Sequence, residues 1–135
     1  MPGEFLTDAQ EQAYGHFVGP PSKQQLSRYF HLDDADRELV SVRRGLHNKL
    51  GFALQLTGVR FLGTFLAEPT AVPSNAVAYV AVQLGIRDVA CLTDYATRPT
   101  TVREHAAEIR RVYGYRDFSD PGASFRLVRW LYQRA

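Results

Sequence analysis

The side chains of this chain best suited to chemistry are cations and amides gathered in two separate segments. The first segment, residues 43–52, supplies the candidate side chains Arg43, Arg44, His47, Asn48 and Lys49. The second, residues 100–111, supplies Thr100, Thr101, Arg103, His105, Ala107, Arg110 and Arg111, and is flanked by Arg98, Tyr115 and Arg116. Guanidinium, amide and hydroxyl groups hydrogen-bond phosphates and base edges. Both segments therefore predict contact with a polyanion, and double-stranded DNA is the leading candidate.

The second segment has the spacing of a helix with one buried face. Its predicted core positions are Val102, Ala106, Ile109 and Tyr113. The opposite stripe is Arg103, Ala107 and Arg110. We interpret this segment as a recognition helix, with a short helix over residues 88–96 as the first member of a helix-turn-helix. The alternative is a solvated helix on which Glu104, Glu108 and Arg111 pair with one another.

The role of the first segment depends on where a helix begins. We favour a break near Ser41, which places the cations at the amino end of the next helix. There the helix dipole disfavours each cation by about 0.3–1 kcal/mol, and a bound phosphate would relieve the conflict. The alternative is a continuous helix from Asp36, which removes the dipole argument and leaves an exposed basic patch.

Motifs for other kinds of chemistry are absent from the sequence. His47 and His105 lie far apart and have no cysteine or paired carboxylate at metal-ligand spacing, so no metal site is predicted. Asp33, Asp34 and Asp36 have the acidic composition of a helix start rather than of a catalytic cluster. The sequence contains no glycine-rich phosphate loop, nucleophile elbow or HExxH motif. We therefore predict no enzyme activity and no cofactor for this chain.

Basic residues are unevenly distributed along the 135 residues. Residues 1–42 contain three basic and seven acidic side chains, whereas the remainder contains thirteen basic and seven acidic ones. Fourteen of the sixteen basic residues are arginines, whose planar group suits bidentate contact with phosphate or guanine. The charge asymmetry indicates a nucleic-acid partner. A GC-rich genome explains the arginine excess equally well.

The cellular compartment is indicated by cysteine content and by the absence of targeting signals. Cys91 is the only cysteine, so an internal disulfide is impossible, and we expect Cys91 to be buried and inert. The amino end lacks the basic and apolar regions of a signal peptide, and no apolar stretch is long enough to span a bilayer. These features predict a bacterial cytoplasmic protein with no membrane partner.

The positions of the apolar residues predict an all-helical fold, because they recur at spacings of three and four without sustained alternation. Capping pairs indicate helix starts. Those pairs are Thr7 with Gln10, Ser22 with Gln25, and Thr101 with Glu104. Further starts are expected at Asp33 or Asp34, at Ser74 as a cap, at Asp88, and near Ser119.

The most apolar stretch, residues 46–66, predicts a central buried helix. Its stripe is Leu46, Leu50, Ala53, Leu54, Thr57 and Phe61. Gly51 and Gly58 are expected to permit close helix approach, and Gly63 either to do the same or to end the helix. We predict a compact module of two helical lobes, residues 1–68 and 69–135, with the candidate recognition helix over 100–113 in the second.

Ordered motifs over nearly the whole chain carry a family resemblance. In the first half they are Arg43-Arg44, the run from His47 to Leu56 and the run from Arg60 to Gly63. In the second half they are Val72-Pro73, Val77 to Tyr79, Gln83 to Ile86, Tyr95, Arg98, Thr101, Arg103 to His105, Glu108-Ile109 and Tyr113 to Arg116. The chain resembles the amino-terminal region of the transposases of the Tn-three family of bacterial replicative transposons. Lys49 departs from the arginine common at its position.

The resemblance implies a piece of a longer polypeptide that contributes to binding terminal inverted repeats. In the family, the metal-dependent DDE nuclease core lies much later, and nothing in this sequence matches it. The implied partners are double-stranded DNA at transposon ends and the remainder of the transposase chain, with a homo-oligomer left open. The alternative function is a protein-interaction or oligomerisation scaffold, for which the apolar stretch from Phe52 to Leu66 would serve if partly exposed.

Overall fold

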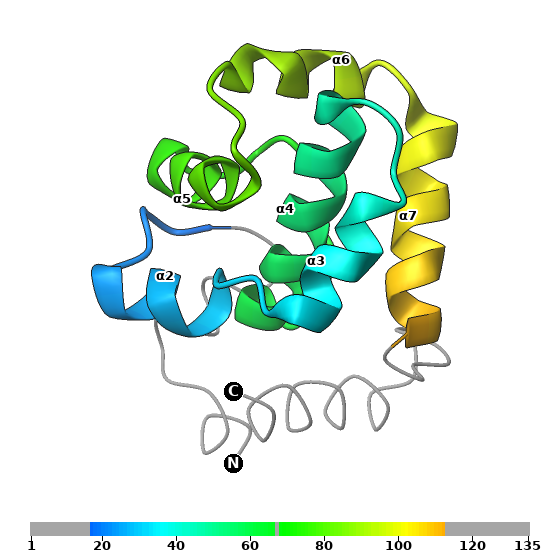
Figure 1. Ribbon diagram of the computed structural model, residues 1–135. Helices are drawn as coiled ribbons and strands as arrows, with labels where there is room; N and C mark the ends of the chain where they lie inside the picture. The colour runs from blue at the N-terminus through cyan, green and yellow to red at the C-terminus, as the bar shows by residue number, and fades with distance from the viewer. Residues whose placement is uncertain (1–16, 67, 113–135) are drawn as a thin grey trace.

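The computed structural model describes residues 17–66 and 68–112, and this part of the chain is all helical, without strands. Its elements are α2 (Lys23–Tyr29), α3 (Asp34–Ser41), α4 (Leu46–Leu62), α5 (Ser74–Leu84), the 3₁₀ turn η2 (Val89–Cys91), α6 (Leu92–Ala96) and α7 (Pro99–Val112) (Figure 1). The predicted fold class is therefore confirmed. The helices expected to start at Thr7 and near Ser119 lie outside the described residues, as do Tyr113, Tyr115 and Arg116.

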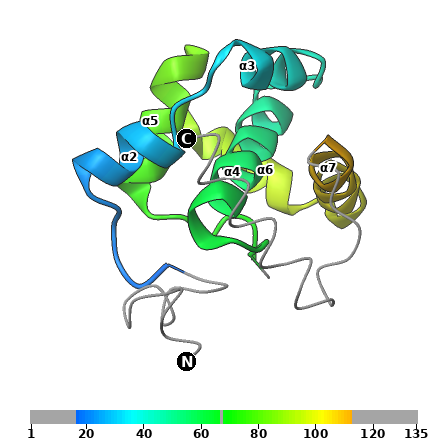
Figure 2. The ribbon, with the colours of Figure 1, turned by 90° about the horizontal axis from the view of Figure 1, so that it is seen from below.

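Helix α4 is the centre of the structure and contacts α2, α3, α5, α6 and α7 (Figure 2). Ten of its seventeen residues are buried, as expected for a helix that is apolar nearly all round. One apolar cluster joins residues of α2 to α7, with Phe30, Leu50, Phe52, Leu56 and Val80 completely buried. The boundary between lobes at residue 68 stays a prediction, and this cluster contains residues from both sides of it.

The two predicted helix starts at Ser22 and Asp33 are confirmed by their capping geometry. The Ser22 side chain accepts from the Gln25 backbone N–H at 3.2 Å, and the Gln25 side chain accepts from the Ser22 N–H at 2.8 Å. Asp33 and Asp36 form the same reciprocal pair at 2.8 and 3.0 Å. Helix α3 ends at Ser41, so the continuous helix from Asp36 is excluded.

Other boundaries differ from the sequence-based prediction. Helix α7 begins at Pro99 rather than at Thr101, because proline suits the first turn, where no backbone donor is needed. Ser74 is the first residue of α5, and Pro73 occupies the cap. The segment predicted as one helix over 88–96 is a 3₁₀ turn followed by five helical residues. The helix-turn-helix therefore stays a prediction.

Glycines act at three different kinds of position. Gly63 and Gly85 end α4 and α5 with φ of 80° and 72°, a left-handed conformation that other residues rarely adopt. Gly51 lies directly against the ring of Tyr95, so α4 and α6 approach closely there, as predicted. Gly58 has no atom within 4 Å of the place a Cβ would occupy, so the predicted close approach there is wrong.

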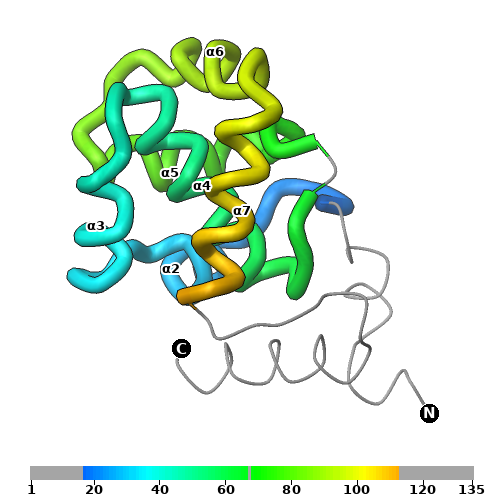
Figure 3. The backbone as a smooth tube through the Cα atoms, turned by 90° about the vertical axis from the view of Figure 1, so that its right-hand side faces the viewer, coloured from blue at the N-terminus to red at the C-terminus, as the bar shows by residue number. Residues whose placement is uncertain are grey.

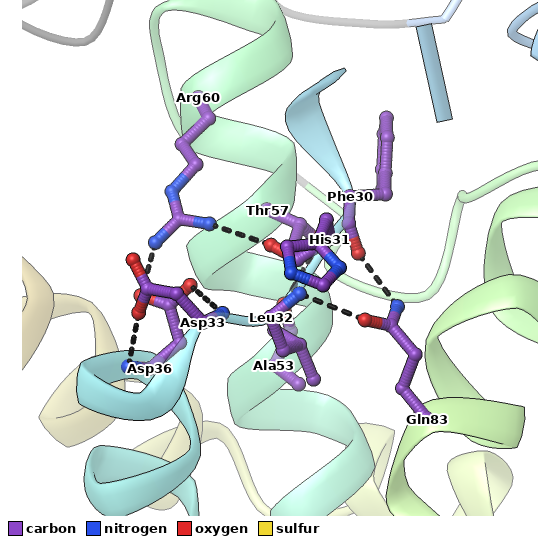
Figure 4. A network of polar contacts seen from close by, with 9 residues as sticks. All are labelled: Phe30, His31, Leu32, Asp33, Asp36, Ala53, Thr57, Arg60 and Gln83. Atoms are coloured by element: carbon purple, nitrogen blue, oxygen red, sulfur yellow. Dashed lines mark hydrogen bonds and ion pairs between the residues drawn. The ribbon is translucent and has the colours of Figure 1, made fainter. Parts of the chain in front are cut away.

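A polar network fixes the connection between α2 and α3 against α4 and α5 (Figure 4). The side chain of Gln83 accepts from the Leu32 N–H and donates to the Phe30 carbonyl, both at 2.8 Å. Arg60 donates to the His31 carbonyl at 3.2 Å and forms an ion pair with buried Asp36. These bonds hold α3 on α4 and so determine where the chain emerges after Ser41.

In the part of the chain that the structure describes, no single helix combines the length and apolarity needed to cross a membrane. Helix α5 together with Val89–Ala96 meets that criterion only as a pair, and the pair is bent by 108°. Much of the pair's apolar surface, including Ala76, Val80 and Tyr95, lies in the core.

Candidate nucleic-acid interface

The first basic segment begins in the connection between α3 and α4, residues 42–45. Gly45 precedes α4 with φ of 81°, and the first turn of α4 contains no acidic residue. Arg43 and Arg44 precede this turn, and His47, Asn48 and Lys49 follow in it. The predicted juxtaposition of cations with the positive end of a helix dipole is therefore present.

Arg43 is held inside the protein by three helices. Its Nε donates to the Leu39 carbonyl of α3 at 3.3 Å, and its guanidinium lies 4.3 Å from the ring centroid of Phe52 in α4. Its Nη2 is 3.8 Å from the Glu108 carboxylate of α7, and only 18% of the side chain is exposed. Burial lowers the pKa of Arg43. These contacts give Arg43 a structural role. A phosphate that bound Arg43 would share the guanidinium with Leu39, Phe52 and Glu108.

Glu108 connects the two basic segments. Besides approaching Arg43, it forms an ion pair with Arg111 one turn along α7. The Glu108–Arg111 part of the alternative predicted for this helix, in which its charged side chains pair with one another, is therefore present. The same carboxylate places the α3–α4 connection beside α7 on one side of the molecule (Figure 3).

The outward stripe predicted for α7 is confirmed by its exposure: Arg103, Ala107 and Arg110 are exposed. Arg103 lies 3.4 Å from the Thr100 hydroxyl, a weak contact, and the Arg110 guanidinium lies 5.1 Å from the ring centroid of Phe65. The other exposed candidates are Arg44, Arg98, Thr100 and Arg111. Thr101 and Lys49 are partly exposed. Exposed cations thus occur on both the connection and the helix.

His105 differs from the other candidates, because its side chain is turned into the core and is only 5% exposed. Its Nδ1 lies 2.8 Å from the Tyr95 hydroxyl, whose oxygen also accepts from Gln55 at 2.6 Å. Burial lowers the pKa of His105 to about 4, with the charge of Arg43 adding to the effect. Burial also raises the pKa of Tyr95 to about 12. We therefore remove His105 from the candidate DNA contacts.

His47 and Asn48 are partly exposed, and both contribute to the shape of the connection. A Cβ at Gly45 would lie 3.0 Å from the His47 ring, so the ring packs over that glycine. The Asn48 side-chain nitrogen donates to the Arg44 carbonyl at 2.8 Å, and its Oδ1 is buried without a partner among the described residues. The Asn48 amide therefore orders the connection, and base contact by this side chain is not supported.

Two apolar residues at this site are exposed, although periodicity assigns both to buried faces of helices. The spacing predicts Leu46 on the buried stripe of the central helix, and this is wrong, because Leu46 is 56% exposed. Val42 is 67% exposed. Periodicity does not predict the exposure of either residue, because Val42 follows the end of α3 and Leu46 lies in the first turn of α4.

No group of three or more His, Cys, Asp or Glu side chains among residues 17–66 and 68–112 is arranged to hold a metal ion. Cys91 is partly exposed rather than fully buried as expected, and burial raises the pKa of its thiol. A raised pKa disfavours the reactive thiolate.

Comparison with known proteins places this chain in a family. A family model described as a domain of unknown function (DUF4158) matches residues 5–135, so the chain belongs to that family. Its sequence also matches the amino-terminal region of Tn-three family transposases, which confirms the resemblance drawn from its motifs.

Particular relatives give the extent of the match. The chain is 53% identical over 135 residues to the transposase for transposon gamma-delta of Escherichia coli (strain K12), covering all of this chain and 14% of the relative. It is 38% identical over 111 residues to the transposase for transposon Tn501 of Pseudomonas aeruginosa, covering 82% of this chain and 11% of the relative. The chain therefore spans about one seventh or less of these relatives' length.

Proposed function

We propose that this chain is the DNA-binding amino-terminal region of a transposase and recognises the terminal inverted repeats of its transposon. The observation that carries the proposal is the shared position of two basic segments. The connection after α3 and helix α7 lie side by side, joined through Arg43, Glu108 and Arg111. The similarity to transposases supports a DNA partner, and this piece is proposed to bind DNA without cleaving it.

The proposed surface consists of the exposed cations and hydroxyls of the two segments. Its members are Arg44, Lys49, Arg98, Thr100, Thr101, Arg103, Arg110 and Arg111, with Ala107 allowing close approach. Tyr115 and Arg116 stay predicted members beyond the described residues. Arg43 supports this surface from beneath. Arginine and lysine contacts to phosphate supply most of the affinity, whereas side chains that reach base edges supply sequence preference.

The proposal is tested by measuring the affinity of the chain for a duplex of the transposon end at several salt concentrations. Each neutralised phosphate contributes about −0.9 to the slope of log affinity against log salt, so four contacts give a slope of about −4. Replacing Arg44 and Arg103 with Ala is expected to reduce the steepness of that slope by about 2 and to weaken binding to every duplex. A flat salt response would refute the proposal.

Arg87→Ala is the matched control for these variants. Arg87 is exposed and lies in the connection between α5 and η2. Its replacement removes one positive charge, so it is compared with Arg44→Ala and Arg103→Ala taken singly. Binding through the proposed surface predicts that Arg87→Ala retains nearly the salt slope of the unmodified chain. Equal losses in all variants would indicate attraction by net charge without a defined surface.

A scaffold function is the second candidate. The structure offers a different surface for it than the sequence predicts. Most apolar side chains of the predicted stretch from Phe52 to Leu66 are buried in the core, and Phe61, Phe65 and Leu66 are partly exposed. Little of this stretch is therefore available to a partner. A groove of about 520 Å³ between α3 and α5 offers a different surface, lined by Arg37, Tyr79 and Val82, the last 76% exposed. Sedimentation of Val82→Asp distinguishes the candidates, because a scaffold at this groove predicts altered assembly with unchanged DNA affinity.

A further inference from the structure

Two large apolar side chains are exposed within the most cationic stretch of the described chain. Val42, which follows the last residue of α3, is 67% exposed, and Leu46, the first residue of α4, is 56% exposed. Arg43, Arg44 and Gly45 lie between them. Exposed apolar side chains of this size are common singly, but a pair flanking an exposed arginine on one short connection calls for a partner that is both anionic and apolar.

The connection that carries Val42 and Leu46 is held in place in the free protein. The Arg43 backbone N–H donates to the Val40 carbonyl at 3.0 Å, and the Asn48 side chain donates to the Arg44 carbonyl at 2.8 Å. The Gly45 carbonyl accepts from the Lys49 N–H at 3.1 Å. The conformational entropy of ordering this segment is therefore lost on folding and not on binding, which favours a recognition role.

Charge narrows the choice of partner. Between residues 42 and 49 the charged side chains are Arg43, Arg44 and Lys49, all basic. A polyanion that also displays apolar groups at the depth of a protein side chain is duplex DNA, because thymine presents its C5-methyl group in the major groove. An uncharged apolar peptide would satisfy the two apolar side chains but would leave the cations without a counter-charge. An acidic peptide with apolar side chains would supply both, and the similarity to transposases favours DNA over it.

We propose that Val42 and Leu46 contact thymine methyl groups in the major groove and thereby select A·T pairs at fixed positions of the recognised site. This inference rests on the proposed DNA-binding function and adds the determinants of sequence preference. Arg44 between them supplies the phosphate or guanine contact that holds the connection in the groove.

The test uses the complete 135-residue chain and a duplex that it selects from a randomised pool. Each thymine of the selected duplex is then replaced in turn by deoxyuridine, which lacks only the methyl group. Loss of one buried methyl contact is expected to weaken binding about fourfold, and one or two thymines are expected to show it. Leu46→Ala and Val42→Ala are each expected to weaken binding to the thymine duplex and to lose the response at one of those positions, as in a double-mutant cycle.

Val82→Ala is the matched control, since it removes the same two methyl groups as Val42→Ala from an exposed valine on α5. It is expected to retain the full deoxyuridine response. Circular dichroism of each variant verifies folding. Because Val42 and Leu46 are exposed, their truncation is expected to leave the fold intact.

The outcomes separate this inference from the function on which it rests. Salt-dependent binding with no deoxyuridine effect, or with an effect that persists in both alanine variants, overturns the methyl contacts and leaves DNA binding intact. Altered sedimentation of Val42→Ala or Leu46→Ala with unchanged DNA affinity overturns it in favour of a protein partner. Failure of the unmodified chain to bind any duplex at low salt overturns both proposals.

Discussion

Glu108 is a partly buried carboxylate that lies among the cations of the proposed DNA surface. It approaches Arg43 at 3.8 Å and forms an ion pair with Arg111, and its side chain is 22% exposed. In the free protein it orders these arginines, but in a complex its charge would repel phosphate. The residue therefore favours a well-ordered surface at the expense of affinity.

We predict that Glu108→Gln raises DNA affinity about two- to fivefold at low salt, because it removes one repulsive charge at partly screened distance. The gain should shrink between about 50 and about 200 mM salt. Binding titrations of this variant check the prediction. Glu68→Gln changes net charge equally at an exposed position of the connection after α4 and should have a smaller effect. Unchanged or weaker binding by Glu108→Gln would show that ordering outweighs repulsion.

His105 makes the stability of the protein sensitive to acid. Burial lowers its pKa to about 4, well below the 6.5 of an unfolded histidine. Between these values the unfolded chain binds a proton that the folded chain does not, so the free energy of unfolding falls as the pH falls. We predict a loss of about 3 kcal/mol attributable to His105 as the pH drops from about 7 to about 4. Urea unfolding at several pH values measures it.

His105→Asn is the matched control for this prediction. An Asn side-chain oxygen can accept a hydrogen bond from the Tyr95 hydroxyl in place of the ring nitrogen, but the Asn amide does not titrate. Other titrating groups contribute equally to the acid sensitivity of both proteins. The difference between the two pH profiles therefore isolates His105. Parallel profiles would contradict the assignment.

Helix α4 gives a test of packing between elements, because it contains two buried glycines in different surroundings. At Gly51 a Cβ would run into the ring of Tyr95, which cannot easily move because Gln55 and His105 hold its hydroxyl. At Gly58 the same atom would meet open space. We predict that Gly51→Ala lowers the free energy of unfolding by about 1–3 kcal/mol.

Gly58→Ala is the matched variant, and it is expected to raise the free energy of unfolding by about 0.5–1 kcal/mol through helix propensity alone. Chemical denaturation of both variants measures the two changes. A stabilised Gly51→Ala protein would show that α6 shifts away from α4 without cost, which would argue against a fixed junction behind α7.

The boundaries of several elements follow from the sequence because they depend on local contacts. Ser22 and Asp33 start helices through side chains three residues away, and Gly63 and Gly85 end helices through a left-handed conformation. These interactions need no knowledge of the rest of the fold.

The candidate site was predicted less completely, because its details depend on tertiary contacts. His105 is buried because Tyr95 and Phe52, distant in sequence, supply a hydrogen bond and a ring contact. Leu46 is exposed because α3 ends before α4 begins and does not cover its first turn. The spacing of apolar residues in the sequence predicts which residues share a helix face. Which face is covered depends on how the other helices pack.

At the scale of the whole molecule, the described part of the chain shares one core. Helix α4 comes from the first predicted lobe, yet it contacts α5, α6 and α7 from the second. Gln55 of α4 donates to the Val102 carbonyl of α7 at 3.1 Å, and Arg37 of α3 donates to the Gln83 carbonyl of α5 at 2.9 Å. The proposed DNA surface is likewise shared, since Arg43 and Glu108 come from opposite sides of residue 68.

We therefore predict that residues 1–68 and 69–135 do not fold when produced separately. Without α5–α7, one side of α4 would expose residues such as Leu50, Leu56 and Val59, which are at most 1% exposed in the intact chain. Nuclear magnetic resonance spectra of each half should lack the dispersion of a packed core, and mixing the halves should restore dispersion and DNA binding together. A well-dispersed spectrum for residues 1–68 alone would instead establish two lobes with independent cores, and the basic surface would then require their docking.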